Sequence, residues 1–395
     1  MTPSASSHRT TIRTVLAWHR PLSVNVVLMA ALVLVATVGL FVDDRVLLNE
    51  SVWVKPWKFG FAFAAYSATL AWLLTKLTKA RRFGWWLGTA FAVFGTFDVA
   101  AIALAAARGT FSHYNAQEDV FNRLVQTVFE YGVPPLLLSN LVIGVLVLVQ
   151  RTGDRALSWA LRAGLALSTV GMAVALMLIP LSDVGEGHTV GDANGDQVPM
   201  SAGHGIGDPD GTGMPLTNWS TTGGDLRVPH FIGLHGIHVL LAVVLTLAAL
   251  APRHVWLRDE RVRTGLVGAV ALGYGGLLAV TTWQAARGQS LVHPDSATLL
   301  ALAGVALVTV AAGLAAVVSG RRRAARARRG LRPPTARRGQ RSRLLPGYFS
   351  IRWRCGSETA LPSRRAIPSG VTECRTVLRT RRVVMRPDSR RIAAC

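Results

Sequence analysis

Residues 84–107 read GWWLGTAFAVFGTFDVAAIALAAA, a run of 24 residues with one charged side chain, Asp98. At about 1.5 Å per residue, a helix of this length measures about 36 Å, enough to cross a hydrocarbon core of about 30 Å. The run is continuous and has no alternation of period two, so it predicts a transmembrane helix and not a strand of a barrel.

Seven further runs of this kind flank the first one, and together they predict an all-α, polytopic helix bundle. The eight expected spans lie near residues 22–42, 57–77, 84–107, 131–150, 157–181, 230–251, 264–286 and 296–319. The chain thus divides into an N-terminal segment 1–21, a transmembrane domain 22–320 with a long connection 182–229, and a tail 321–395.

Basic residues between the spans indicate their orientation. If the N-terminus is cytoplasmic, the inner segments carry 20 Lys and Arg residues and the outer segments carry seven. Cytoplasmic connections of membrane proteins are enriched in these residues. We therefore expect a multi-pass protein of the cell membrane, surrounded by the lipid bilayer, with both termini in the cytoplasm. The sequence does not indicate an oligomeric state.

The net charge of +22 belongs to the tail and not to the spans. Residues 321–395 hold 22 Arg, no Lys and three acidic residues, a balance of +19, which leaves +3 for the rest of the chain. This distribution excludes the whole chain as a nucleic-acid-binding protein. The tail is expected to be disordered and to bind anionic lipid headgroups, with nucleic acid a less favoured partner. It also has the composition of an out-of-frame extension.

Two short patterns recur with the same topology. Pro56–Gly60 and Pro229–Gly233 both follow P-x-x-x-G at the start of a span, and Ala-Arg-Gly ends a span at 107–109 and at 286–288. The members of each pair are separated by four spans. An even number of spans keeps the orientation of a repeat, so the pattern suggests a parallel 4+4 duplication.

Polar side chains fall at one expected depth, about 13 Å from the outer ends of four spans. These are Tyr66, Asp98, Asn140 and His238, with His235 one turn away. An ionisable side chain within the membrane indicates function by default. One interpretation is a site for a ligand or ion in which Asp98 pairs with His235 or His238. The alternative is a structural hydrogen bond between two helices.

The same residues suggest a metal site. Asp98, His235 and His238 supply two imidazoles and a carboxylate, a ligand set that binds divalent metals. Haem is less favoured, because its two axial ligands should come from facing helices and only one span carries His at depth. The sequence leaves the cofactor unknown.

Cationic side chains gather on the expected outer side. They are Lys55, Lys58, Arg108, His113, Arg227, His230 and Arg287. They predict a vestibule for an anionic group. For Arg108 and Arg287 there is a second interpretation, because a cation at a helix C-terminus complements the helix dipole.

The connection 182–229 is expected to be flexible and acidic. Its segment Asp192–Asp196 is similar to a calcium loop, but the Gly and Glu that an EF-hand needs are replaced by Gln197 and Gly203. Its last part, residues 218–225, is expected to fold over the site as a lid. Cysteines occur only in the tail, so thiol catalysis in the spans is excluded.

Four strings are distinctive: SVWVKPWKFGFAF (51–63), ARGTFSHYN (107–115), NWSTTGGDLRVPHFIGLHGIH (218–238) and WQAARGQSLVHPD (283–295). They resemble an uncharacterised family of bacterial polytopic membrane proteins over roughly residues 22–320. The resemblance implies a membrane location and a multi-pass fold, but no catalytic residue.

Three functions follow as hypotheses. The first is a protein that binds a small polar ligand or ion from the outer side, as a transporter or sensor does. The second is a membrane-embedded metal-dependent or redox enzyme that uses Asp98, His235 and His238. The third is a structural membrane protein. The sequence does not decide between transport, sensing and catalysis.

Overall fold

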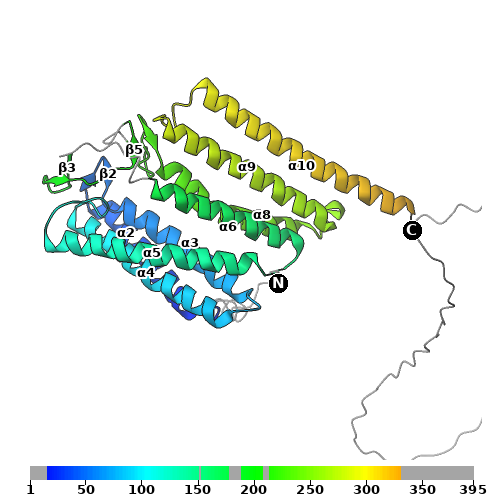
Figure 1. The fold of residues 1–395 in the computed structure, drawn as a ribbon, viewed down its shortest axis with the longest axis horizontal. Coiled ribbons are helices and arrows are strands. Elements are labelled where there is room, and N and C mark those ends of the chain that lie inside the picture. Colours follow the sequence, from blue (N-terminus) through cyan, green and yellow to red (C-terminus); the bar gives the residue numbers. More distant parts are fainter. Residues whose placement is uncertain (1–15, 151–152, 178–187, 208–212, 331–395) are drawn as a thin grey trace, which may run out of the picture. The chain divides into compact units, whose positions relative to one another are not determined.

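The computed structural model describes residues 16–150, 153–177, 188–207 and 213–330. Long helices dominate these ranges, which confirms the all-helical class, and they run back and forth along a common direction (Figure 1). They are α2 (Arg20–Val42), α3 (Val54–Thr75), α4 (Arg81–Arg108), α5 (Val120–Leu148), α6 (Arg155–Leu176), α8 (Arg227–Leu250), α9 (Glu260–Ala286) and α10 (Ser296–Gly330). A short 3-10 helix, Val255–Arg258, precedes α9.

Seven helices in the described part of the chain are long and apolar enough to cross a membrane. They are α2, α4, α5, α6, α8, α9 and α10. Such a set is consistent with a multi-pass protein in a membrane. The helix left out is α3, which carries Lys55 and Lys58 in its first turns and Tyr66 and Ser67 at its middle. The prediction of an eighth span therefore stays a prediction.

Helix α5 begins at Val120 and not near residue 131, as the apolar run had suggested. Asp119 caps its first turn, where its Oδ1 accepts hydrogen bonds from the backbone N–H groups of Phe121 (2.9 Å) and Asn122 (3.0 Å). A capping Asp satisfies N–H groups that have no partner within the helix. The first turns of α5 carry polar residues such as Arg123 and Glu130, so hydropathy alone places the start too late.

Helix α10 continues to Gly330, beyond the expected end of the last span near 319. The first ten residues of the predicted disordered tail, 321–330, are therefore helical. Ala and Arg are among the best helix formers, which accounts for the extension through the sequence RRRAARARR. The rest of the tail, 331–395, and the first residues, 1–15, lie outside the described residues.

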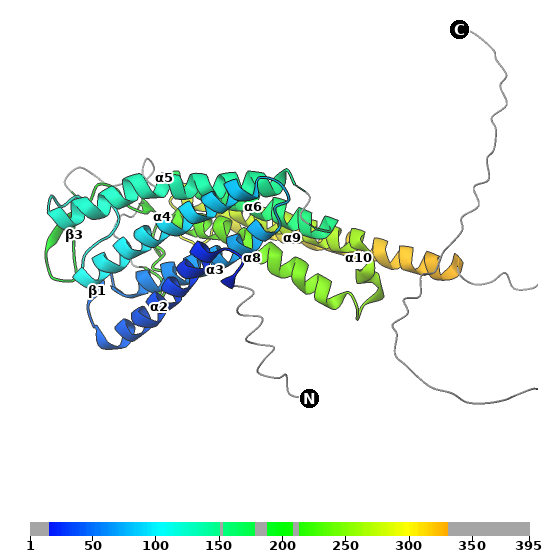
Figure 2. The same ribbon diagram turned by 90° about the horizontal axis from the view of Figure 1, so that it is seen from below.

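Short antiparallel strands lie at one end of the helices, which we call the strand end (Figures 1 and 2). Strand β1 (Val46–Leu47) pairs with β2 (Glu50–Ser51), β3 (Thr189–Gly191) with β4 (Gln197–Pro199), and β5 (Gly205–Ile206) with β6 (Gly224–Asp225). The last four strands belong to the α6–α8 connection. The prediction that this connection is flexible is wrong for its described parts, 188–207 and 213–226, which are folded.

The helices pack in the same pairwise pattern twice. In the first half, α2 packs along α3 and α4, α3 along α4, and α4 along α5. In the second half, α6 packs along α8 and α9, α8 along α9, and α9 along α10. We use the terms first half for α2–α5 and second half for α6–α10. One hydrophobic core joins them, with Leu70 and Ile143 from the first half and Leu161 and Leu240 from the second.

Glycines allow the closest helix contact of the second half, between α6 and α8. A Cβ added to Gly171 would lie 2.7 Å from the Cα of Gly233, and one added to Gly164 would lie 2.7 Å from the Cα of Ile237. Real Cβ atoms do not approach backbone atoms so closely. Small residues at such crossings are typical of helices packed in lipid.

A buried hydrogen-bond network joins three helices of the first half. The Asn25 amide on α2 donates to Thr96 Oγ1 on α4 (2.7 Å), and Ser67 Oγ on α3 donates to Asn25 Oδ1 (2.7 Å). Asn25 and Ser67 are fully enclosed, with 1% and 0% of their surface exposed. Buried polar groups of this kind are stable only when their partners are present.

Candidate functional site

Polar side chains from both halves meet midway along the helices. Tyr66 on α3 hydrogen-bonds through its hydroxyl to Ser168 Oγ on α6, and its ring lies edge-on to His238 on α8, with centroids 5.2 Å apart. Asn140 on α5 approaches the same hydroxyl. We call Tyr66, Asn140, Ser168, His235 and His238 the mid-helix layer. Three members of the predicted layer, Tyr66, Asn140 and His238, are thus brought together.

Two atoms of this layer have no hydrogen-bond partner within the described residues: Asn140 Oδ1 and His238 Nε2. The other nitrogen of His238, Nδ1, lies 3.2 Å from His235 Nδ1. A hydrogen bond between two Nδ1 atoms requires one to carry the proton and the other to accept it. Both atoms are enclosed by protein, with Asn140 close to the Tyr66 hydroxyl and His238 close to the Ala65 carbonyl.

Asp98 does not belong to the mid-helix layer. Tyr66 stacks on Phe91 of α4, with centroids 5.9 Å apart, and Asp98 follows Phe91 by two helical turns. At about 1.5 Å per residue, Asp98 lies about 10 Å closer to the strand end. The ring contact thus sets Asp98 apart from the other three residues of the predicted layer along α4, and their common depth in a membrane stays a prediction.

Asp98 is buried and has no direct partner. Only 5% of its surface is exposed, and its Oδ1 atom has no hydrogen-bond partner in the ranges that the structure covers. The predicted pairing of Asp98 with His235 or His238 is not present there. The charge that acts on Asp98 is that of Lys55, at the start of α3. The two groups interact through space but lie farther apart than the 4.0 Å of an ion pair.

Charged residues at the strand end form a cluster beside Asp98. Lys58 Nζ pairs with Glu50 Oε1 at 3.0 Å and donates to the Thr217 carbonyl at 3.1 Å. Arg227 Nη2 pairs with Asp225 Oδ2 at 2.6 Å. Both carboxylates are well shielded, with 13% of the Glu50 side chain and 1% of the Asp225 side chain exposed. The cluster thus joins the starts of α3 and α8.

Lys55 is the cation of this group without a carboxylate partner among the described residues. Its Nζ lies 3.4 Å from Nδ1 of His113, which also lies 3.0 Å from Ser112 Oγ. His113 follows α4, and its ring contacts Phe59 of α3 at 6.2 Å and Phe129 of α5 at 4.2 Å. We call Glu50, Lys55, Lys58, His113, Asp225 and Arg227 the strand-end cluster.

Desolvation at the strand end favours neutral side chains. Burial holds the pKa of His113 and of His204 well below the ordinary 6.5, and the nearby Lys55 charge acts in the same direction. Burial also raises the pKa of Glu50, against the opposing effect of Lys58. These shifts are those of an interior from which bulk water is largely excluded.

The α6–α8 connection covers the strand end and bonds to both halves. Its Ser201 N–H donates to the Tyr114 carbonyl at 2.9 Å in the first half, and its Ser220 carbonyl accepts from Ser290 Oγ at 3.0 Å in the second. Its carbonyl groups at Thr217 and Asn218 accept from Lys58 and Arg227. The predicted lid, 218–225, therefore lies against the strand-end cluster.

Three residues of the predicted vestibule bond to groups outside the strand-end cluster. Arg108 pairs with Asp119 at 3.3 Å, and Arg287 pairs with Asp295 at 2.8 Å, both near the surface. Both arginines lie at helix C-termini, as the alternative interpretation expected. His230 Nδ1 lies 2.8 Å from the Gly171 carbonyl and so joins α8 to α6.

The predicted metal ligands do not form one site. In the described part of the chain, no three His, Cys, Asp or Glu side chains are grouped as a metal would need. His235 and His238 are adjacent, but Asp98 lies in the direction of Lys55 and the strand end. The Asp192–Asp196 segment uses its carboxylate for a turn, since Asp192 Oδ1 accepts from the backbone of Asn194 and Asp196.

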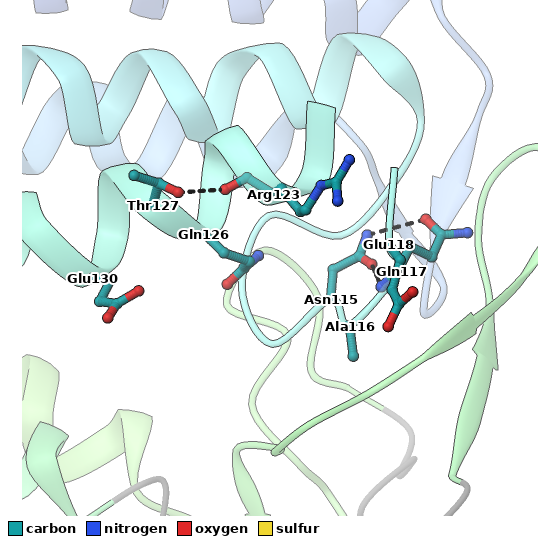
Figure 3. A pocket seen from close by; sticks show the side chains of 8 residues that line it. All are labelled: Asn115, Ala116, Gln117, Glu118, Arg123, Gln126, Thr127 and Glu130. Carbon is teal, nitrogen blue, oxygen red and sulfur yellow. Dashed lines mark hydrogen bonds between the residues drawn. The ribbon is translucent and has the colours of Figure 1, made fainter. Parts of the chain in front are cut away.

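A surface pocket of about 350 Å³ opens beside the first turns of α5 (Figure 3). It is lined by Asn115, Ala116, Gln117, Glu118, Arg123, Gln126, Thr127 and Glu130. None of these is a predicted site residue, and several bond to one another, as Asn115 Nδ2 does to Gln117 Oε1 at 3.4 Å. The pocket lies outside the strand-end cluster as we define it.

Sequence reasoning missed Glu50 and Asp225, the two acidic members of the cluster. Asp225 could have been found, because an Asp often accepts the backbone N–H of the second residue after it, as Asp225 Oδ1 does from Arg227 at 2.9 Å. Glu50 gave no such signal, since the hairpin β1–β2 alone brings it to Lys58. The Asn25 network was also missed, because one Asn in an apolar run does not show which helices it faces.

No protein-family model, no curated protein and no solved structure matches this chain.

Proposed function

We propose that this chain is a multi-pass membrane protein that binds a small polar ligand or ion from the extracytoplasmic side, as a transporter or sensor does. The strand end is the extracytoplasmic end, and the ligand binds next to Asp98. Anionic lipid headgroups contact the Arg-rich end of α10. The membership in a bacterial family that the four strings suggest is part of the same proposal.

Packing supports α3 as an eighth crossing. Helix α3 lies along both α2 and α4, which are themselves long enough to span a membrane. Its polar residues Tyr66 and Ser67 do not face lipid, because they are buried among neighbouring helices. A helix of modest hydropathy is tolerated in a membrane where its polar groups are enclosed by protein. Eight crossings put both termini on the same side of the membrane, and the distribution of Lys and Arg favours the cytoplasmic side.

The matched packing of the halves supports an internal duplication. Helices α4 and α9 also end alike: Gly109 (φ 77°) and Gly288 (φ 69°) are left-handed, and each follows an arginine that pairs with an acid capping the next helix. A left-handed glycine at this place ends a helix without steric strain. Binding sites of duplicated membrane proteins often lie between the repeats near mid-membrane.

The observation that carries the proposed function is the isolation of Asp98. A carboxylate buried without a hydrogen bond or ion pair is costly in any protein interior. Structural carboxylates in membrane helices pair with a neighbour, which Asp98 does not do in the described residues. A site that is completed by a cation or a hydrogen-bond donor from outside accounts for both the burial and the missing partner.

Asp98→Asn tests this proposal. Asn removes the charge but keeps the size, so the free energy of unfolding should stay the same or rise by up to about 2 kcal/mol. The variant should also lose the thermal shift that the wild-type protein shows with its ligand class. The measurement is thermal unfolding of both proteins in detergent with inorganic ions, sugars and amino acids, one class at a time.

Two outcomes contradict the proposal. If Asp98→Asn unfolds more easily and no class shifts the wild-type protein, Asp98 has a structural role. If the purified protein instead holds a stoichiometric metal or haem that His238→Ala removes, the enzyme hypothesis gains over ligand binding. The separation of Asp98 from the His pair makes that second candidate the weaker one.

A further inference from the structure

Lys55 on α3 and Asp98 on α4 are side chains of opposite charge on neighbouring helices, and they are not in contact. Each acts on the other electrostatically, and neither has an oppositely charged side chain in direct contact within the described ranges. The remaining charges of the strand-end cluster are matched in pairs, Lys58 with Glu50 and Arg227 with Asp225. The cluster therefore contains one unmatched cation, Lys55, and Asp98 beside the cluster is an unmatched anion within the described residues.

The helix register places these two residues at the same level. Phe63 on α3 stacks on Phe91 on α4, with centroids 6.0 Å apart. Asp98 lies two turns from Phe91 toward the strand end, and Lys55 lies about two turns from Phe63 in the same direction. The two backbones thus carry their charged side chains at a similar height on neighbouring helices.

The direction of the two helices keeps the charges apart. Side chains lean toward the N-terminus of their own helix, and α3 and α4 run in opposite directions. Lys55 therefore leans toward the strand end, where its ammonium group lies 3.4 Å from His113 Nδ1, and Asp98 leans toward the other end. The separation of the two charged groups therefore follows from the opposite directions of α3 and α4.

The surroundings of His113, beside the Lys55 ammonium group, are aromatic. Phe59 follows Lys55 by one turn on α3, and the rings of Phe59 and Phe129 both contact His113. His113 is kept neutral by burial, which lowers its pKa, so it adds no charge of its own. A ligand between Lys55 and Asp98 meets one cation and one anion, with aromatic rings on the Lys55 side.

We propose that the ligand is a small zwitterion of the α-amino acid class, with its carboxylate on Lys55 and its ammonium group on Asp98. This inference rests on the proposed function and specifies its ligand. Such a molecule satisfies both unmatched charges at once, which a simple anion or a simple cation cannot do. Charge-assisted hydrogen bonds at both ends also fix its orientation.

Matched analogues test the inference on the purified full-length protein. Alanine and leucine carry both charges, lactate lacks the ammonium group, and alaninol lacks the carboxylate. We expect alanine or leucine to bind in calorimetry and to raise the unfolding temperature. Lactate and alaninol should bind about a hundredfold more weakly, because each leaves one buried charge unpaired.

Two variants test which residue binds each end of the ligand. Asp98→Asn should weaken amino acid binding about a hundredfold and reduce the preference for alanine over lactate, whose hydroxyl suits a neutral amide. Lys55→Gln should reduce the preference for alanine over alaninol. Arg108→Gln is the matched control, because Arg108 is a cation of the same end that pairs with Asp119 outside the cluster. It should bind amino acids like the wild-type protein.

The outcomes separate this inference from the proposed function. If lactate or an inorganic ion binds as well as alanine, or if no amino acid binds while Asp98→Asn is at least as stable as wild type, the zwitterion is wrong and ligand binding stands. If nothing binds and Asp98→Asn is less stable, both are wrong. If a variant fails to fold, the preference among the analogues in the wild-type protein still decides.

Discussion

The two halves of the molecule have the same pairwise helix contacts but are held together differently. In the first half, the side chains of Asn25, Ser67 and Thr96 join three helices by hydrogen bonds. In the second half, Gly171 and Gly233 let two backbones touch, and no side chain lies between them. The first arrangement depends on hydrogen bonds between side chains, and the second combines close glycine contacts with side-chain bonds to the backbone, such as that of His230 to the Gly171 carbonyl.

The two halves therefore contribute different polar residues to the site. The first half already encloses polar groups and supplies both Lys55 and Asp98, the unmatched charges. The second half supplies Arg227 and the pair His235 and His238, all on α8, whose position against α6 is set by glycine. Close backbone contact holds α8 rigidly, because packing at such a crossing tolerates little displacement.

Gly171→Leu should break the second half and have the largest effect. The new side chain begins 2.6 Å from the Leu234 backbone nitrogen, a clash that neither helix can relieve without moving. We expect a loss of more than about 3 kcal/mol in the free energy of unfolding, or no folded protein. Fluorescence-detected size-exclusion chromatography and thermal unfolding measure this. Gly268→Ala is the control, since nothing lies within 4 Å of its added Cβ.

Asn25→Leu should weaken the first half to a smaller degree. The substitution leaves Ser67 and Thr96 without the partner they share, and an unsatisfied buried group costs about 1–3 kcal/mol. Thermal unfolding is the measurement, with Thr37→Ala as the control because Thr37 bonds only within its own helix in the described residues. An unchanged stability of Asn25→Leu would show that packing alone holds α2, α3 and α4.

His204 should make the stability of the strand end depend on pH. The unfolded chain takes up a proton near the ordinary pKa of 6.5, whereas the folded chain does not, because burial lowers the pKa of His204. The free energy of unfolding should therefore fall below pH 6.5, by about 1 kcal/mol per pH unit until the folded-state pKa is reached.

His204→Gln isolates this contribution. The variant should lose less stability than wild type between pH 7.5 and pH 5.5. Glu50 contributes with the opposite sign, since its raised pKa favours the fold at lower pH, and His113 with the same sign. Comparing the variant with wild type at each pH cancels both, and parallel curves for the two proteins would contradict the prediction.

Hydropathy predicted the helical class and most helix positions, because long apolar runs leave little choice in a membrane. It failed at Val120, where a capping Asp begins the helix within a polar segment. For the site, the expected depth within the spans grouped Tyr66, Asn140 and His238, which the helices do bring close together. It could not separate Asp98 from them, because the offset of α4 against α3 is set by stacked rings such as Phe63 and Phe91.

A hydrogen bond of the α6–α8 connection can form only after both of its partners have been synthesised, so these bonds form in a set order. Residue 109 of the first half, which the connection contacts through Ala193, is synthesised long before Ser290 of the second. At about 5–20 residues per second, the interval is about 10–40 s. The ribosome has thus synthesised all the described helices except α10 before the α6–α8 connection can make its bond to Ser290. Until then, the nascent chain carries Lys55 and Asp98 next to a connection that has formed only part of its hydrogen bonds.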